Sequence, residues 1–234
     1  MKLIVVGFYK KHILENQIKK FGFKIDKRNP DIAIAYGGEG TCLWAEQIYP
    51  NLPKLFLRHS SKCRNCKNHR FNNILKLLKN RKFKILNLTK VEANVNGRKV
   101  SGMNEINLHY SPPRALRFLL KLNNKIISKE LVGDGIVVAT PYGSTGYFYS
   151  ITGRNFNRGL GIAFNNSTKR MKAIITGENS KIHVKILREK GVVCADTNDK
   201  IIKIRKGNVI LIKKSDKKAR MIKLNGNNLK VDIK

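Results

Sequence analysis

The sequence has no uninterrupted apolar run near the ~20 residues that a membrane-spanning helix requires, although 41% of its residues are hydrophobic. That lack argues against a membrane protein, and the composition is typical of a globular one. A strand-like apolar segment at residues 3–6 leaves no place for a signal peptide. We therefore expect a cytoplasmic protein without a membrane partner.

Cysteines are also few: Cys42, Cys63, Cys66 and Cys194. Because cytoplasmic thiols are usually reduced, these four residues do not indicate a disulfide framework.

Acidic residues are scarce, since 15 Asp and Glu stand against 48 Lys and Arg, and the formal net charge is +33. Such a balance favours polyanionic ligands, which include nucleotides, polyphosphate and nucleic acid. The basic residues are spread along the whole chain, however, as a biased genome or a salty, hot cytosol would also produce. Diffuse charge is not a binding motif, so we do not expect a nucleic-acid partner. The high charge nevertheless does not exclude one.

Hydrophobic patterning divides the chain into two halves near residues 80–88. In the first half, predicted strands alternate with predicted helices, which indicates a mainly parallel sheet flanked by helices. The second half consists of short β-rich segments separated by turn residues. We predict an α/β + β fold: an N-terminal α/β domain over residues 1–84, with 221–234 as a candidate completion, and a C-terminal β-rich, sandwich-like domain over residues 85–220.

The predicted elements are as follows. The first half has strands at 3–7, 23–25, 31–35 and 52–57, and helices at 10–21, 43–48 and 71–78. The second half has strands at 83–88, 91–95, 99–101, 106–110, 116–122, 126–131, 135–139, 161–164, 181–187, 191–195, 201–204 and 209–213, and a helix that starts at 147.

Three glycines surround a carboxylate at residues 37–41, where an apolar strand gives way to a predicted helix. Gly38 and Gly40 would let backbone N–H groups approach an anion, and a helix N-terminus adds partial positive charge. A carboxylate there repels phosphate, so in a nucleotide site Glu39 must carry Mg²⁺ or take a proton from an attacking hydroxyl. The alternative is a glycine-rich turn with a solvated Glu, because a short glycine motif is weak evidence and the third glycine of a Rossmann fingerprint is missing.

A second informative stretch, residues 133–147, runs from a buried strand into a Pro/Gly turn that presents the hydroxyls of Ser144 and Thr145. Small hydroxyls and N–H groups at such a turn suit phosphate or ribose contacts. Asp134, which precedes the strand, could accept hydrogen bonds from ligand hydroxyls or an amide. The alternative is a capped strand-to-helix connection, in which Ser144 or Thr145 is the N-cap of the helix that starts at Tyr147.

In this order and with similar separations, residues 37–41 (GGEGT), the pair Asn104-Glu105 and residues 134–147 (DGxxxxTPxGSTxY) resemble the NAD kinase family. Its signatures are a GGDGT loop, an NE pair and a DGxxxxTPxGSTAY segment. The likeness extends from about residue 31 to residue 209, and the ordered combination is far more specific than any one motif. It implies a two-domain homo-oligomer that transfers a phosphoryl group from ATP, or in some members polyphosphate, to the 2′-hydroxyl of the adenosine ribose of NAD.

The resemblance also implies roles for individual residues. Glu39 takes the position of the family's catalytic aspartate, so it would be the general base, while Mg²⁺ or another divalent cation and N–H donors neutralise the phosphoryl charge. Asn104 would suit an adenine edge, Asp134 the nicotinamide end and Asp196 the nicotinamide ribose. The full implied set for nucleotide and NAD binding is Gly38, Gly40, Thr41, Asn104, Glu105, Asp134, Ser144, Thr145, Tyr147 and Asp196.

Three departures from the family pattern keep other functions open. Glu39 is longer than aspartate by one methylene, and a placement error of ~1 Å can cost ~100-fold in rate. Tyr142 replaces a small residue, and the family's glycine-rich GxNxGxLGF segment is replaced by residues 58–70. One alternative is a kinase of the same fold that acts on another alcohol, such as a sugar or nucleoside. A further alternative is a non-catalytic nucleotide- or nucleic-acid-binding protein.

The replacement segment contains four residues that can bind zinc: His59, Cys63, Cys66 and His69. A Cys-x2-Cys knuckle with flanking histidines can complete a tetrahedral site for structural Zn²⁺ and so stiffen a loop that has lost its glycines. The alternative is a pair of free thiols in a cationic loop.

Overall fold

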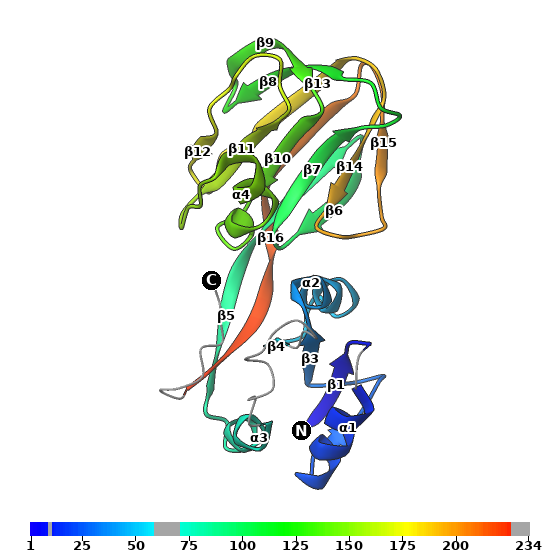
Figure 1. Ribbon diagram of the computed structural model, residues 1–234, viewed down its shortest axis with the longest axis vertical. Helices are drawn as coiled ribbons and strands as arrows, with labels where there is room; N and C mark the ends of the chain where they lie inside the picture. Colours follow the sequence, from blue (N-terminus) through cyan, green and yellow to red (C-terminus); the bar gives the residue numbers. More distant parts are fainter. Residues whose placement is uncertain (9–10, 59–70, 226–234) are drawn as a thin grey trace. The chain divides into compact units, whose positions relative to one another are not determined.

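The computed structural model describes residues 1–8, 11–58 and 71–225 (Figure 1). These residues form two compact units. Unit 1 holds the described residues up to Leu88 and those from Ala219 on, and unit 2 holds Thr89–Lys218. We propose that the two units are the predicted domains 1–84 and 85–220, with the chain after residue 219 completing unit 1.

Unit 1 is built on a parallel sheet in the order β2-β1-β3-β4-β16. Its elements are β1 (Lys2–Val6), α1 (Lys11–Lys20), β2 (Lys24–Ile25), β3 (Ile32–Gly37), α2 (Glu39–Ile48), β4 (Lys54–Arg58), α3 (Phe71–Lys79), the start of β5 (Phe83–Val95) and the end of β16 (Val209–Leu224). The central strand β3 is buried from Ile32 to Tyr36, because a parallel strand flanked by helices has no solvent face. Leu14 and Ile18 of α1 lie one turn apart and both face the core.

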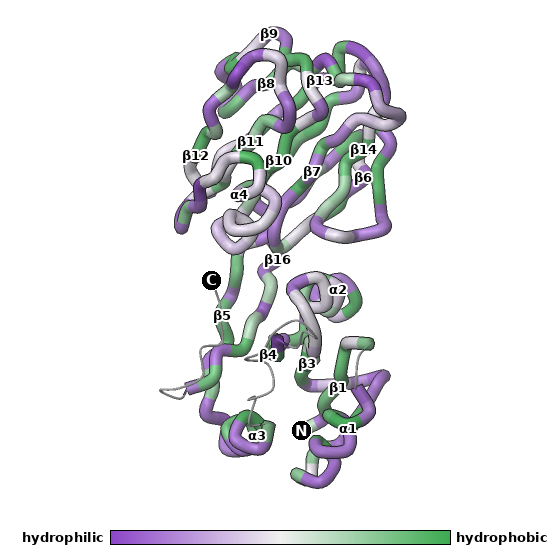
Figure 2. The backbone as a smooth tube through the Cα atoms, in the orientation of Figure 1, coloured by the Kyte–Doolittle hydropathy of each residue, from purple (hydrophilic) through white to green (hydrophobic). Residues whose placement is uncertain are grey.

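Unit 2 is a sandwich of antiparallel sheets around a large hydrophobic core. One sheet has the order β12-β11-β10-β7-β14-β15, and the other layer contains β16-β13-β8-β9. Figure 2 shows the apolar residues of the central strand β10 as a continuous green run. The elements are β6 (Arg98–Gly102), β7 (Glu105–Tyr110), β8 (Leu116–Leu122), β9 (Lys125–Gly133), β10 (Gly135–Ala139), η2 (Gly143–Thr145), α4 (Tyr147–Thr152), β11 (Leu160–Asn165), β12 (Ile174–Thr176), β13 (Ile182–Arg188), β14 (Gly191–Ala195) and β15 (Ile202–Ile204).

The predicted fold class is confirmed: a mainly parallel α/β sheet is followed by a β-rich sandwich. Four details of the element prediction were wrong. The segments 83–88 and 91–95 are one strand, β5, and the strand predicted at 209–213 continues to Leu224. Strand β12 was missed, and the helix predicted from residue 43 begins at Glu39.

The turn that follows β2 is held by the carboxylate of Asp26. Its Oδ1 accepts the backbone N–H groups of Arg28 and Asn29, each at 2.9 Å, and its Oδ2 lies 3.1 Å from Nζ of Lys2. The N–H of Asn29 first, and then Lys2, lower the pKa of this carboxyl to about 2.

We predict that an NMR titration will find Asp26 titrating near pH 2, well below its ordinary value of 3.8. Because the folded pKa is depressed, the stabilisation is fully present above the ordinary value and is lost as the pH falls through about 2. The Asp26→Asn variant assigns the signal by removing it. A pKa at the ordinary value would contradict the turn geometry.

Candidate functional site

The glycine-rich residues 37–41 connect the carboxyl end of β3 directly to α2. Gly38 is the N-cap, with φ −82° and ψ −174°, and its carbonyl accepts the N–H groups of Thr41 at 3.1 Å and Cys42 at 3.3 Å. Glu39 is therefore in the first turn of the helix and not in a loop before it. A half-buried carboxylate at this end of α2 interacts favourably with the partial positive charge of the helix N-terminus.

The three glycines of this segment do different things. A Cβ at Gly37 would collide with the side chain of Thr41, so Gly37 is required by packing. No described atom lies within 4 Å of a Cβ built at Gly38 or Gly40, and both residues are exposed. Neither is needed for packing. The space they leave beside the helix N-terminus allows an anion to approach the backbone N–H groups.

In unit 2, the turn after β10 is hydrogen-bonded to the backbone of Met103 and Asn104. The backbone N–H of Thr140 donates to the carbonyl of Asn104 at 2.8 Å, and Oγ1 of Thr140 donates to the carbonyl of Met103 at 2.6 Å. The same Oγ1 accepts the N–H of Gly143 at 3.1 Å. A Cβ at Gly143 would overlap the backbone of Asn104. Residues 103–105 and 140–143 therefore form one rigid piece.

The carboxylate of Asp196 also binds the backbone of the Asn104-Glu105 pair. Its Oδ2 accepts the N–H of Met103 at 2.8 Å, and its Oδ1 accepts those of Asn104 at 2.8 Å and Glu105 at 3.1 Å. Burial raises the pKa of this carboxyl, against the opposing effect of the three N–H groups and the charge of Lys90. We infer that Asp196, predicted from the resemblance to lie at the nicotinamide ribose, acts on a ligand through the residues it positions.

In the turn of residues 140–145, the hydroxyl turn, the hydroxyl of Ser144 makes hydrogen bonds within the protein. Ser144 is buried, and its Oγ lies 2.8 Å from the carbonyl of Pro141 and 3.0 Å from that of Phe156. The N-cap of α4 is Gly146, which makes no side-chain cap bond, so the alternative of Ser144 or Thr145 as N-cap was wrong.

Of the remaining predicted residues of unit 2, Asp134 comes directly before β10 and Tyr147 is the first residue of α4. The hydroxyl of Tyr147 accepts Nδ2 of Asn165 at 3.0 Å, and Oδ2 of Asp134 accepts Nδ2 of Asn166 at 3.2 Å. These contacts connect both residues to the end of β11. Unit 2 thus brings together Asn104, Glu105, Asp196 and the turn after β10, whereas Glu39 belongs to unit 1.

Comparison with known proteins decides the family. The model of the ATP-NAD kinase C-terminal domain matches residues 103–224. The chain belongs to the ATP-NAD kinase family. A relative named NAD kinase from Sulfurisphaera tokodaii is 31% identical over an alignment of 188 residues that covers 78% of this chain and 73% of that protein. Another, from Picrophilus torridus, is 28% identical over 90% of this chain and 80% of its own length.

Solved structures of an NAD kinase and of an NADH kinase share the fold. An NAD kinase from Archaeoglobus fulgidus, in complex with ATP, has a TM-score of 0.77 at 19% identity and covers 96% of this chain and 93% of that one. Yeast NADH kinase, in complex with NADH, has a TM-score of 0.78 at 14% identity and covers 97% and 84%. At such identities the likeness concerns the fold alone.

One face of β7 extends the polar site of this family member beyond the predicted residues. Glu105, Asn107 and His109 alternate along the strand, so they share the face opposite the core residues Ile106 and Leu108. Asn107 Oδ1 is buried and has no hydrogen-bond partner in the described chain. The alternation of polar and apolar residues along β7 is the sequence signal from which these three polar side chains could have been predicted to share a face.

Cys194 of β14 lies opposite Asn107 in the sheet and is a free thiol. Burial, followed by the charges of Glu105 and Asp196, raises its pKa. The protonated thiol is therefore not a nucleophile at neutral pH.

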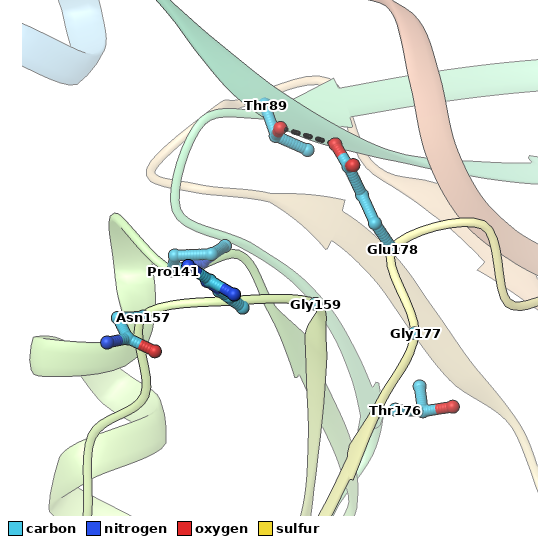
Figure 3. A pocket seen from close by; sticks show the side chains of 8 residues that line it. Thr89, Pro141, Asn157, Gly159, Thr176, Gly177 and Glu178 are labelled. Carbon is cyan, nitrogen blue, oxygen red and sulfur yellow. Dashed lines mark hydrogen bonds between the residues drawn. The ribbon is translucent and has the colours of Figure 1, made fainter.

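A cavity of about 470 Å³ opens in unit 2 beside Pro141, where the hydroxyl turn begins (Figure 3). On its wall, Oε1 of Glu178 accepts a hydrogen bond from Thr89 Oγ1 at 2.8 Å. This bond, together with the charges of Lys214 and Lys218, lowers the pKa of Glu178. The cavity is within the size range of small-molecule sites. Its lining residues are Thr89, Pro141, Asn157, Arg158, Gly159, Thr176, Gly177 and Glu178.

The zinc prediction concerns His59, Cys63, Cys66 and His69, which lie outside the described residues. Within residues 1–8, 11–58 and 71–225, no group of three or more His, Cys, Asp or Glu side chains is arranged to hold a metal ion. Zinc therefore stays a prediction, and metal analysis of the purified protein against the Cys63→Ser/Cys66→Ser variant tests it. None of the described helices combines the length and apolarity needed to span a bilayer.

Proposed function

We propose that the chain transfers the γ-phosphoryl group of ATP to the 2′-hydroxyl of the adenosine ribose of NAD, forming NADP and ADP. The observation that carries this proposal is the carboxylate of Glu39, which stands in the first turn of α2 between two glycines that no packing requires. Family membership and the NAD kinase relatives support it. Inorganic polyphosphate is the other donor to be tested.

In the proposed reaction, Glu39 accepts the proton of the ribose hydroxyl while that oxygen forms a bond to the γ-phosphorus. The bond from this phosphorus to the β,γ-bridging oxygen breaks, and ADP leaves with the electron pair. Backbone N–H groups beside Gly38 and Gly40 would stabilise charge on the transferred group. Asn104 and Glu105, held by Asp196, would orient the acceptor.

A divalent cation, Mg²⁺ by preference, fits this arrangement as a partner of the ATP phosphates. Mg²⁺ typically takes one or two carboxylates and completes its shell with water and substrate phosphates. Glu39 can supply a carboxylate, and the described residues hold no cage of three acidic or imidazole groups. Bound there, the cation would neutralise charge on the transferring phosphoryl group. We also propose that the protein is a cytoplasmic homo-oligomer.

The test is to incubate purified protein with MgATP and NAD and to measure NADP. Replacing ATP by polyphosphate, and NAD by NADH, then defines donor and acceptor. Consumption of ATP with a sugar or nucleoside but not with NAD would favour a kinase for another alcohol. No turnover together with tight, salt-sensitive binding to DNA or RNA would favour the non-catalytic alternative.

The Asp196→Asn variant should raise the KM for NAD with a smaller effect on kcat, lowering kcat/KM about tenfold. An amide NH2 would face a backbone N–H of residues 103–105 that now meets a carboxylate oxygen, so Asn104 and Glu105 shift. Steady-state kinetics with varied NAD measure the effect. Asp199→Asn, three residues away and exposed, is the matched control. Equal kinetics for the two variants would contradict a positioning role for Asp196.

A further inference from the structure

An aromatic pair of one exposed and one half-buried ring lies in unit 1 next to the glycine-rich segment. The rings of Phe8 and Trp44 are stacked, with centroids 4.8 Å apart and an interplanar angle of 6°. Phe8 is 87% exposed, so the ring face turned away from Trp44 is open to solvent. Neither residue belongs to the hydrophobic core of unit 1.

The backbone fixes the pair beside the functional segment. Strand β1 pairs with β3 in a register that sets Val6 opposite Ala35. A Cβ at Gly7 would overlap the carbonyl of Tyr36, so the two chains stay in close contact beyond the last ladder pair. Phe8 is the next residue along the chain, and its ring stacks on that of Trp44. From the other side, Trp44 extends from α2, the helix whose first turn contains Glu39.

An open aromatic face at this position suits one class of ligand. Purine rings stack on aromatic side chains, and such stacking depends little on the identity of the base because every base has a flat π-face. The neighbouring helix N-terminus and exposed glycines suit the phosphates of the same molecule. The net charge of +33 further attracts a polyanionic nucleotide and is of no help to an uncharged apolar partner.

We propose that Phe8, supported by Trp44, is a stacking platform for the adenine ring of a nucleotide whose phosphates approach residues 37–40. The proposal deepens the proposed function, on which it rests for the identity of the nucleotide. Adenine occurs in both ATP and NAD, and the binding experiment separates these two sources. It assigns a recognition role to residues that none of the family motifs includes.

The experiment uses Trp44, which is the single tryptophan of the chain, as its own reporter. Its emission is followed, with excitation beyond the adenine absorption band, while the full-length protein is titrated with MgATP, NAD, magnesium tripolyphosphate or nicotinamide mononucleotide. We expect saturable quenching by ATP or by NAD and none by the two ligands without adenine. Whichever adenine nucleotide quenches at the lower concentration is the one that stacks on Phe8.

The Phe8→Leu variant keeps an apolar side chain but removes the aromatic face. We expect its affinity for the quenching nucleotide to fall about tenfold, and its affinity for tripolyphosphate, measured by calorimetry, to stay unchanged. Tyr149→Leu, which removes an exposed aromatic residue of unit 2, is the matched control. Because Phe8 is exposed, circular dichroism should show both variants folded.

Three results would overturn the platform: quenching by tripolyphosphate as strong as by ATP, no quenching by any of the four ligands, or native affinity in Phe8→Leu. Failure of the proposed function is a separate result. If no NADP forms but an adenine nucleotide still quenches Trp44 and loses affinity in Phe8→Leu, the platform stands and the reaction assignment falls.

Discussion

The Glu39→Gln variant should lose phosphoryl transfer almost completely while retaining nucleotide binding. Gln has the same length and can occupy the same place in the first turn of α2, but its amide cannot accept the proton of the ribose hydroxyl. Removal of a general base typically lowers the rate by about 100- to 10,000-fold. The measurements are NADP formation and, separately, the affinity for MgATP.

Two further variants make this result specific. Glu130→Gln changes an exposed carboxylate of β9 in unit 2 and should leave turnover as it is. Glu39→Asp restores the residue type found in the family motif but retracts the carboxylate by one methylene, and we expect about 100-fold lower activity because the first turn of α2 positions the longer side chain. Unchanged turnover in Glu39→Gln would remove this residue from the mechanism.

The second large effect is on stability, and it concerns a buried ion pair between α2 and β4. Lys54 of β4 and Glu46 of α2 are both fully buried, at 0% and 2% exposure, and Nζ of Lys54 lies 2.7 Å from Oε2 of Glu46. The same ammonium donates to the carbonyl of Leu52 at 2.5 Å. Glu46 lies in the same helix as Glu39, seven residues further along. The Lys54–Glu46 pair therefore connects the helix that carries the proposed base to the sheet.

Replacing Lys54 by Met should lower the free energy of unfolding by about 3–5 kcal/mol, because the buried carboxylate of Glu46 loses the ammonium that compensates its charge. Urea denaturation measures the change. The double variant Lys54→Met/Glu46→Met should recover most of the loss, since no buried charge remains. Lys11→Met, which breaks the solvent-accessible pair with Glu15 at 3.6 Å, should cost at most about 0.5 kcal/mol. Equal losses for Lys54→Met and Lys11→Met would contradict the assignment.

Much of the fold could be predicted because its signals are local. The apolar run of β3 and the glycines after it locate the strand-to-helix junction, and the alternation of short β segments predicts the sandwich. The start of α2 was misplaced because glycine disfavours helix, and here Gly38 is the N-cap and Gly40 lies inside the first turn. Strand β16 was cut short because its middle, residues 213–220, is mostly charged, although its backbone continues to pair.

The site was predictable only as far as motifs reach. Motif order identified Asn104 and Asp196, but not the hydrogen bond that joins them across 92 residues of sequence. That contact depends on how β7 and β14 pair, which no local pattern encodes. The stacking of Phe8 on Trp44 was missed for the same reason: each residue is unremarkable in sequence, and the register of two strands brings them together.

The return of the chain to unit 1 has a consequence for the order in which the protein is made. During synthesis, β4 remains an open sheet edge until the ribosome has passed the whole of unit 2, because its partner Met221 comes afterwards. Ile222 and Leu224 also complete the core of unit 1. Although unit 1 begins first, it cannot finish folding until Thr89–Lys218 has emerged, so the newly made N-terminal segment must wait with an unpaired strand.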